Sequence, residues 1–273
     1  MAVPVTIDHR STDYSLKRAY WLALASDLAY KDESVIDAQA REWGFPTVRH
    51  HETRFTPPFP LQDTQAYTMA DDDMIVTAFR GTEPRQIKDW LTDATAPPRR
   101  GPADTGYVHD GFGEALQSIW PDVRNTHREL RTDGQSVWFT GHSLGGALAM
   151  LAGAWMYLED PRLAADGVYT YGQPRTCDAR LAKACNKGLK GRMYRFVNNN
   201  DVVAQLPPEP AYSHAESLRY IDSHGKVRDA MPLIGGLTDR AAGMLADPLA
   251  PATDGVRDHL MHAYLTALEK NLS

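Results

Sequence analysis

A serine flanked by glycines offers the clearest chemistry in the sequence. Residues 141–145, Gly-His-Ser-Leu-Gly, follow an apolar run and precede a long stretch of alanine, leucine and methionine. A serine in such a turn between a strand and a helix is raised onto a strained elbow, where glycine permits the close approach of the two elements. Ser143 is therefore the candidate nucleophile. A glycine-rich connection can also carry a serine without catalytic use, so the rest of the chain must supply an acid, a base and an oxyanion site.

An aspartate that follows a short apolar strand is the candidate acid. Asp201 comes after the predicted strand Met193 to Val197 and three asparagines. In an open parallel sheet the chemistry gathers at the carboxyl ends of the strands, where this aspartate would lie. The alternative is an ordinary turn aspartate.

Four histidines follow Asp201 and could complete the order Ser, Asp, His of α/β-hydrolases. They are His214, His224, His259 and His262. His224 lies in a polar turn, and His262 falls on the polar side of the last predicted helix. His259 stands at the start of that helix, after an irregular stretch, and could reach back over the sheet edge. His259 is the preferred base, and His214 is the second candidate.

Two backbone N–H groups are candidate oxyanion donors. One belongs to Leu144, because the residue after an elbow nucleophile normally supplies a donor. The other belongs to Thr82, in the Arg-Gly-Thr turn that ends a predicted strand from Met74 to Phe79. Gly81 would permit the sharp exit from that strand. A simple turn is the alternative here.

The elements between these residues predict an α/β protein with an open, mainly parallel sheet. The predicted helices cover residues 15–30, 33–43, 111–130, with an interruption at Pro121, and 179–189, besides the elbow helix and the last helix. Residues 66–69 and 74–79 alternate like the strands of a hairpin, and residues 168–172 and 193–197 form βαβ spacing with the helix between them. Residues 217–222 are expected to form a later antiparallel strand, and residues 223–256 mostly loop.

Composition limits the class of protein. The 273 residues are 42% hydrophobic and 9% aromatic, which indicates one globular domain over residues 1–273. No apolar run approaches the roughly 18 residues of a membrane span. The formal net charge of -6 disfavours nucleic acid or an anionic bilayer as a partner. The N-terminus lacks a basic start and an apolar core, so a cytoplasmic location is expected, with secretion by another route left open.

The remaining cysteines and histidines predict no cofactor. Cys177 and Cys185 are expected to be free thiols, because two cysteines do not make a disulfide framework. His9, His50 and His51 lack metal-ligand spacing and are interpreted as surface residues. We therefore expect neither a metal nor a cofactor.

Six motifs resemble, in order, those of the class 3 lipases, the fungal-type triacylglycerol lipase family. They are residues 79–82 (Phe-Arg-Gly-Thr), 109–112 (His-Asp-Gly-Phe), 141–146 (Gly-His-Ser-Leu-Gly-Gly), 171–175 (Tyr-Gly-Gln-Pro-Arg), 199–203 (Asn-Asn-Asp-Val-Val) with 206–208 (Leu-Pro-Pro), and 258–259 (Asp-His). The resemblance is strong from Met74 to Pro208 and weak at the end of the chain. Ala204 stands where the family often has proline. The absence of a leader and of disulfides looks more like a bacterial member than a secreted fungal one.

The resemblance implies an α/β-hydrolase fold with helices on both faces of the sheet. It implies a triad of Ser143, Asp201 and His259, and an oxyanion hole made by Thr82 and Leu144. The family also has a lid, for which residues 83–98 are the candidate here.

Ile87, Trp90 and Leu91 lie on one face of a helical period within that segment. That face could cover an acyl groove and turn to a lipid–water interface; a fixed helix whose apolar face is core is the alternative. Asp93 falls where the family places a carboxylate that holds the hydroxyl of the hole residue, here Thr82.

The activity that these expectations indicate is hydrolysis of lipid carboxylic esters, as in a triacylglycerol lipase. A phospholipase A1 or a short-chain carboxylesterase would use the same machinery on another substrate. A lipid-binding module without catalysis is a further alternative, and it would require a broken triad.

Overall fold

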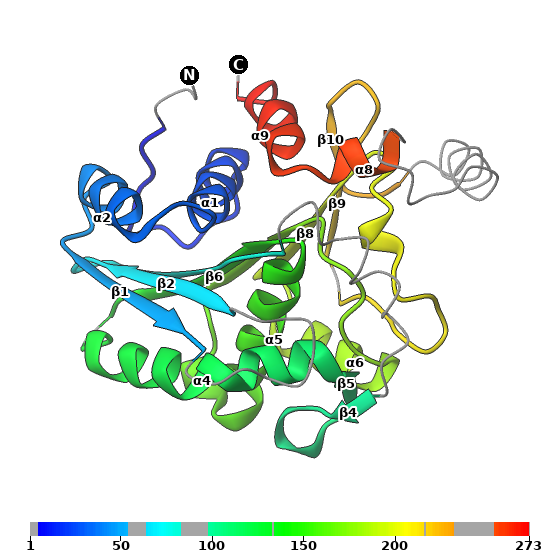
Figure 1. Ribbon diagram of the computed structural model, residues 1–273, viewed down its shortest axis with the longest axis horizontal. Helices are drawn as coiled ribbons and strands as arrows, with labels where there is room; N and C mark the ends of the chain where they lie inside the picture. The colour runs from blue at the N-terminus through cyan, green and yellow to red at the C-terminus, as the bar shows by residue number, and fades with distance from the viewer. Residues whose placement is uncertain are drawn as a thin grey trace.

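The computed structural model describes residues 5–53, 64–82, 98–132, 134–215, 217–231 and 254–272. Its centre is an eight-stranded sheet of order β1-β2-β3-β6-β7-β8-β9-β10 (Figure 1). The strands are β1 (Thr47–Glu52), β2 (Gln65–Ala70), β3 (Met74–Phe79), β6 (Ser136–His142), β7 (Gly167–Tyr171), β8 (Met193–Asn198), β9 (Leu218–Ile221) and β10 (Val227–Arg228). A separate two-stranded sheet contains β4 (Pro98–Arg100) and β5 (Tyr107–His109).

The middle of the sheet is parallel, as predicted. Strands β3, β6, β7, β8 and β9 run in one direction. At the edges, β1 and β2 on one side and β10 on the other are antiparallel to their neighbours. The predicted hairpin is β2 and β3. The carboxyl ends of the central strands therefore meet at one edge of the sheet.

Helices cover both faces of this sheet (Figure 1). One face carries α1 (Leu16–Leu28), α2 (Glu33–Glu42) and α9 (Met261–Glu269), and the other carries α4 (Asp110–Leu130), α5 (Leu144–Glu159) and α6 (Ala179–Gly188). The short α8 (Asp254–His259) precedes α9, and three 3₁₀ turns, η1 (Pro102–Asp104), η2 (Pro161–Leu163) and η3 (Val203–Gln205), lie in connections. None of the helices in the described ranges combines the length and apolarity that a membrane crossing requires.

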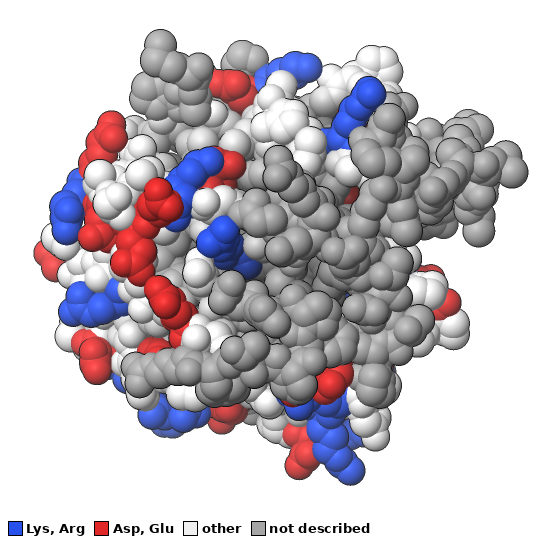
Figure 2. Space-filling view, in the orientation of Figure 1, with Lys and Arg blue, Asp and Glu red and all other residues white. Residues whose placement is uncertain are grey.

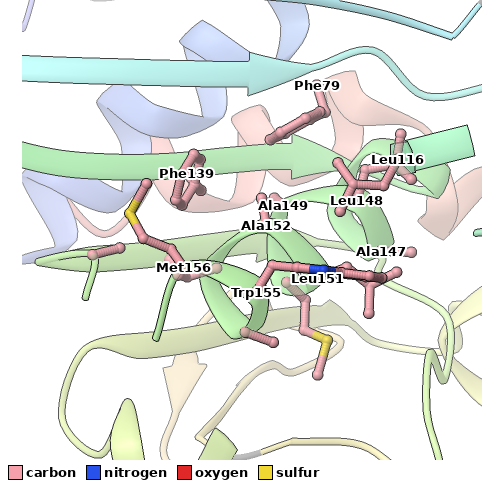
Figure 3. Packing of buried hydrophobic residues seen from close by; sticks show 14 of the residues in the cluster. Phe79, Leu116, Phe139, Ala147, Leu148, Ala149, Leu151, Ala152, Trp155 and Met156 are labelled. Atoms are coloured by element: carbon pink, nitrogen blue, oxygen red, sulfur yellow. The ribbon is translucent and has the colours of Figure 1, made fainter. Parts of the chain in front are cut away.

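Strand β6 lies at the centre because both of its faces are apolar. Val137 and Phe139 belong to the core beneath α4 and α5, whereas Trp138 belongs to the core beneath α1 and α9. Every residue of α5 from Leu144 to Met156 is buried. Figure 3 shows several of them, among them Leu148, Leu151 and Met156, in the core. A strand buried on both faces and a helix buried all round hold Ser143 between two rigid elements.

Charged side chains of both signs are intermixed on the described part of the face in Figure 2. Within the described ranges, no group of three His, Cys, Asp or Glu side chains is placed to hold a metal ion. Cys177 and Cys185 are buried free thiols, as predicted.

Two sequence predictions about elements were wrong, and one strand was not predicted. Strand β9 pairs with β8 in the parallel direction, and only the short β10 is antiparallel. Helix α4 continues through Pro121, since the apolar residues before and after it are buried against the sheet and Pro121 itself is exposed. Strand β1 was not predicted, because its polar sequence shows no alternation; pairing with β2 forms it.

The interpretation of His9, His50 and His51 as surface residues was wrong for His51. His51 is 3% exposed, and its Nε2 lies 2.9 Å from Thr68 Oγ1. His9 and His50 are partly buried and pair with Asp71 and Asp37, respectively.

Candidate active site

Ser143 occupies a strained turn between β6 and α5. Its backbone has φ 58° and ψ −125°, and its N–H donates to the carbonyl of Tyr171 at 2.9 Å. A Cβ on Gly141 would lie 2.2 Å from the oxygen of Gly145, and a Cβ on Gly145 would lie 2.1 Å from the oxygen of Phe79. Glycine is thus required on both sides of the serine, and the surrounding close packing maintains the strained backbone.

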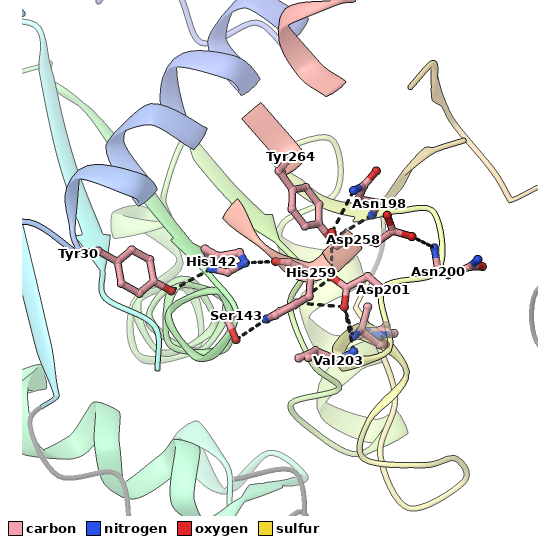
Figure 4. Close-up of polar contacts among 12 residues, drawn as sticks. Tyr30, His142, Ser143, Asn198, Asn200, Asp201, Val203, Asp258, His259 and Tyr264 are labelled. Carbon is pink, nitrogen blue, oxygen red and sulfur yellow. Dashed lines mark hydrogen bonds and ion pairs between the residues drawn. The ribbon is translucent and has the colours of Figure 1, made fainter. Parts of the chain in front are cut away.

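The side chains of Ser143, His259 and Asp201 form a continuous chain of hydrogen bonds (Figure 4). His259 Nε2 lies 2.8 Å from Ser143 Oγ, and His259 Nδ1 lies 2.9 Å from Asp201 Oδ2. The three residues come from the turn after β6, the end of α8 and the loop after β8, and each is about 1% exposed. The structure therefore brings together the three residues that the sequence order predicted.

The proton positions follow from the partners. A carboxylate only accepts hydrogen bonds, so the hydrogen of the neutral His259 ring lies on Nδ1 and points at Asp201. Nε2 then carries a lone pair and accepts from the hydroxyl of Ser143. In this arrangement the serine proton already lies on the path to the imidazole, which is the geometry of general-base activation.

Asp201 is ionised despite its burial. Burial alone would raise its pKa, but the pairing with His259 and the hydrogen bonds from His259 and Tyr264 outweigh it and hold the pKa below its ordinary value. The Tyr264 hydroxyl donates to Oδ2 at 2.6 Å, and the N–H of Val203 donates to Oδ1 at 2.9 Å. The pKa of Tyr264 is raised well above its ordinary value, chiefly by burial and then by Asp201, so its hydroxyl stays a donor.

The main chain around His259 is tied to two strands. The carbonyl of Asp258 accepts from the Asn198 side chain at 3.0 Å, and the carboxylate of Asp258 accepts from the N–H of Asn200 at 3.1 Å. The carbonyl of His259 lies 2.6 Å from His142 Nε2. The imidazole is thus positioned through its backbone as well as through its ring.

Gly172 gives the aspartate and the histidine room to meet. It has φ +59°, and a Cβ there would lie 2.7 Å from Asp201 Oδ2 and 2.8 Å from His259 Nδ1. Any side chain at this position would occupy the space in which the two side chains make their hydrogen bond.

The other candidate bases lie elsewhere. His214 Nε2 donates to the carbonyl of Ala204 at 2.7 Å, which is a structural hydrogen bond, and burial lowers its pKa well below the ordinary value. His224 and His262 are exposed. Among the four histidines, His259 alone hydrogen-bonds Ser143 in the described structure.

The sequence did not indicate three side chains that contact the triad residues or the residue next to them in the structure: Tyr264 on Asp201, His142 on the carbonyl of His259, and Asn198 on the carbonyl of Asp258. In the sequence, Tyr264 lies with Leu260, Ala267 and Leu268 on the apolar side of the last predicted helix, and its hydroxyl gives no separate signal. His142 appeared in the sequence only as one residue of the Gly-His-Ser-Leu-Gly motif.

The predicted oxyanion donors border the same site. Leu144 is the first residue of α5, where backbone N–H groups have no partner within the helix. Thr82 follows Gly81, whose Cβ would lie 2.5 Å from the carbonyl of His142. The Thr82 hydroxyl oxygen is buried and has no hydrogen-bond partner among the described residues. Asp93, Ile87, Trp90 and Leu91 fall in residues 83–97, outside the described ranges.

The sheet and the serine turn at its carboxyl edge define an α/β-hydrolase. The fold is similar to that of lipase II from Rhizopus niveus, with a TM-score of 0.64 and 24% identity over 90% of this chain and 92% of that one. It is also similar to the Rhizomucor miehei triacylglyceride lipase, with a TM-score of 0.62 and 23% identity over 88% and 91% of the two chains.

A family model described as class 3 lipase matches residues 76–211, so this region of the chain is similar to that family. A lipase from Rhizomucor miehei is 34% identical over 54% of this chain and 42% of its own length. The triacylglycerol lipase OBL1 of Arabidopsis thaliana is 28% identical over 73% of this chain and 48% of its own length. The chain thus spans about half the length of these curated relatives.

A third relative bears on location and origin. The secreted mono- and diacylglycerol lipase 1 of Fusarium solani is 31% identical over 58% of this chain and 47% of its own length. These relatives are fungal and plant proteins, which does not support the expectation of a bacterial-looking member. Because one relative is named as secreted, the cytoplasmic location stays a prediction.

Proposed function

We propose that this chain is a serine hydrolase that cleaves carboxylic esters of lipids, with triacylglycerol as the substrate class. The observation that carries the proposal is the 2.8 Å hydrogen bond between Ser143 Oγ and His259 Nε2, backed by the ionised Asp201. The choice of a lipid ester as substrate follows from the similar proteins, because the matching family and the relatives are named as lipases. No matched triad position is altered, which disfavours a silent lipid-binding module.

In the acylation step, Ser143 Oγ attacks the ester carbonyl carbon while its proton passes to His259 Nε2. Asp201 accepts the hydrogen bond from Nδ1–H and stabilises the imidazolium that forms. When the tetrahedral intermediate collapses, the bond to the alcohol breaks, and the alcohol leaves with the proton from Nε2. An acyl group then remains as an ester on Ser143.

Water completes the cycle by the same route. His259 Nε2 removes a proton from water, the hydroxide attacks the acyl carbon, and the fatty acid leaves as Ser143 regains its proton. The N–H groups of Thr82 and Leu144 are proposed to bind the oxyanion in both steps. Losing one such donor costs about 3 kcal/mol of transition-state stabilisation.

Asp93 is proposed to hold Thr82 through its hydroxyl, and the Thr82 oxygen, buried and without a partner among the described residues, is compatible with this role. Thr82→Val keeps the shape and removes the hydroxyl, so we expect it to lower kcat about as much as Asp93→Ala. The double variant should be no worse than either single one. Unchanged turnover in Asp93→Ala would exclude the role.

The segment 83–98 is proposed as a lid whose apolar residues, including Ile87, Trp90 and Leu91, face the acyl groove or a lipid–water interface. Activity that rises when triglyceride emulsifies would support it. A substrate profile limited to soluble short esters would instead favour the carboxylesterase alternative, and preference for phosphatidylcholine would favour phospholipase A1. Turnover measured on p-nitrophenyl esters of graded chain length, on triglyceride and on phosphatidylcholine distinguishes these outcomes.

A fluorophosphonate probe tests the catalytic proposal directly, because it labels only an activated serine. We expect labelling of the intact chain and none of Ser143→Ala. Labelling that persists in Ser143→Ala, or an intact chain that resists the probe, would overturn the assignment.

A further inference from the structure

His142, the residue before the nucleophile, is buried at 4% exposure and makes two hydrogen bonds through its ring. Nε2 lies 2.6 Å from the carbonyl oxygen of His259, and Nδ1 lies 2.9 Å from the hydroxyl of Tyr30 (Figure 4). Tyr30 follows α1, which covers the opposite face of the sheet from α5. The His142 ring therefore connects the backbone of His259 to Tyr30, which follows α1 and is not part of the triad.

The partners determine the direction of both bonds. A carbonyl oxygen only accepts, so His142 Nε2 must carry a hydrogen and donate it to His259. Burial, and next the neighbouring His259, lower the pKa of His142 to about 3, so the ring is neutral at neutral pH. Nδ1 then holds a lone pair and accepts from the Tyr30 hydroxyl. The result is a directed relay from the Tyr30 hydroxyl through His142 to the His259 carbonyl.

His259 needs such support because of where it stands in the chain. It is the last residue of the six-residue α8, and Leu260 separates it from α9. The adjacent carbonyl, of Asp258, is held by Asn198 from β8. Two successive carbonyls are thus bound by two different strands, one carbonyl by β8 and the other by β6.

The relay also borders the nucleophile and the proposed oxyanion turn. Ser143 follows His142 directly, so consecutive residues bind the two ends of His259, one through its carbonyl and one through its ring. A Cβ on Gly81, beside Thr82, would lie 2.2 Å from the Tyr30 hydroxyl. A displacement of Tyr30 or His142 would therefore shift His259, Ser143 and the turn at Gly81 and Thr82 together.

We propose that His142 and Tyr30 are positioning residues that hold the main chain of His259, and so align its Nε2 with Ser143. Neither residue exchanges a proton with substrate. The proposal rests on the proposed function, because alignment matters only if His259 is the base. Since a misplacement of about 1 Å can cost 100-fold in rate, loss of the relay should lower kcat and leave substrate binding intact.

The test compares His142→Phe, His142→Gln and Tyr30→Phe on a soluble p-nitrophenyl ester. We expect kcat to fall about 10- to 100-fold in His142→Phe and severalfold in Tyr30→Phe, with KM within about twofold. His142→Gln retains an N–H donor and should recover part of the loss. Because Tyr30 acts through His142, the double variant Tyr30→Phe with His142→Phe should be no slower than His142→Phe alone.

Active-site titration separates positioning from destabilisation. A merely structural role would reduce the number of sites that a fluorophosphonate titrates and leave kcat per titrated site unchanged. Positioning predicts full titration at a reduced kcat per site. Tyr67→Phe is the matched control. The Tyr67 hydroxyl, like that of Tyr30, links the sheet to the α1 region, but it does so by donating to the Ala25 carbonyl at 2.8 Å and not to His142.

Wild-type kcat per site in both His142→Phe and Tyr30→Phe would overturn the proposal while leaving the proposed function intact. An additive loss in the double variant would also overturn it, because the two residues would then act independently. Absence of ester hydrolysis in the wild-type chain, or its persistence in Ser143→Ala, would instead refute the proposed function.

Discussion

The hydroxyl of Tyr264 in α9 donates to Oδ2 of Asp201 at 2.6 Å, so the aspartate is bound by a second side chain besides His259. Removing this donor leaves a buried carboxylate with one hydrogen bond fewer. A hydrogen bond to a charged group contributes about 1.5–3 kcal/mol. We therefore predict that Tyr264→Phe lowers kcat on a soluble ester about tenfold with KM unchanged. An unaltered kcat would show that Asp201 does not need the donor.

Asp201→Asn tests the tautomer of His259. The amide can donate toward Nδ1, which would favour the ring form with hydrogen on Nε2 and remove the acceptor for the serine proton. The corresponding change in a serine protease lowers kcat about 10⁴-fold. We expect a loss of that order here, measured as kcat and as the rate of fluorophosphonate labelling. A loss below tenfold would mean that Asp201 does not orient the base.

Gly172→Ala should abolish turnover for a steric reason. The new Cβ would meet Asp201 and His259 at less than 3 Å, and the backbone there has φ +59°. We predict a loss in kcat of at least 100-fold. Gly191→Ala is the matched control, because Gly191 has φ +74° and nothing within 4 Å of its Cβ position.

Both glycine variants pay the backbone cost of a left-handed conformation, about 1–2 kcal/mol. Denaturant unfolding should therefore report a loss of stability in each. Only Gly172→Ala should lose activity. Equal kcat values in the two variants would show that the space around Gly172 is not limiting.

Two buried histidines, His51 and His127, predict that the folded protein loses stability in acid. His51 Nε2, Thr68 Oγ1, Thr77 Oγ1 and His127 Nε2 form a chain with contacts of 2.9, 2.7 and 2.8 Å. Burial is the main cause that lowers the pKa of His51 to about 4 and that of His127 to about 3. Both rings are thus neutral in the folded chain at pH values where the unfolded chain has protonated them.

The lowered pKa values of these two histidines make the free energy of unfolding depend on pH. Below about pH 6.5 the unfolded state binds more protons, so the free energy of unfolding falls as the pH falls toward 4. Each histidine contributes a slope of up to about 1.4 kcal/mol per pH unit. We predict a flatter slope in His51→Gln and His127→Gln, measured by urea unfolding from pH 7 to pH 4.5. Exposed His262→Gln should keep the wild-type slope; the same slope in all three variants would contradict the assignment.

The elements that position Ser143 were predictable because their apolar runs are local. Strand β6, helix α5 and strand β8 carry continuous or periodic apolar residues, and Asp201 and His259 follow in the order of the fold. Polar β1 was not predictable from its own residues, because it becomes a strand only through β2. The direction of β9 depends on its pairing with β8, so it could not be predicted from the residues of β9 alone.

The positioning groups were hidden for a similar reason. The hydroxyl of Tyr264 and the ring of His142 gain their roles from partners more than fifty residues away in the chain. A sequence pattern shows that Tyr264 belongs to an apolar stripe and cannot show what its hydroxyl meets. Polar contacts between residues so far apart in the sequence can be recognised only in the three-dimensional structure.

The last described segment, residues 254–272, brings both His259 and Tyr264 to the edge of the sheet where Ser143 and Asp201 lie. Its links to β6 and β8 are hydrogen bonds from His142 and Asn198, and α9 lies on the same face of the sheet as α1. One segment thus supplies both the base for Ser143 and the tyrosine donor for Asp201. A peptide of this segment, added to a chain that ends before it, should restore hydrolysis by fragment complementation.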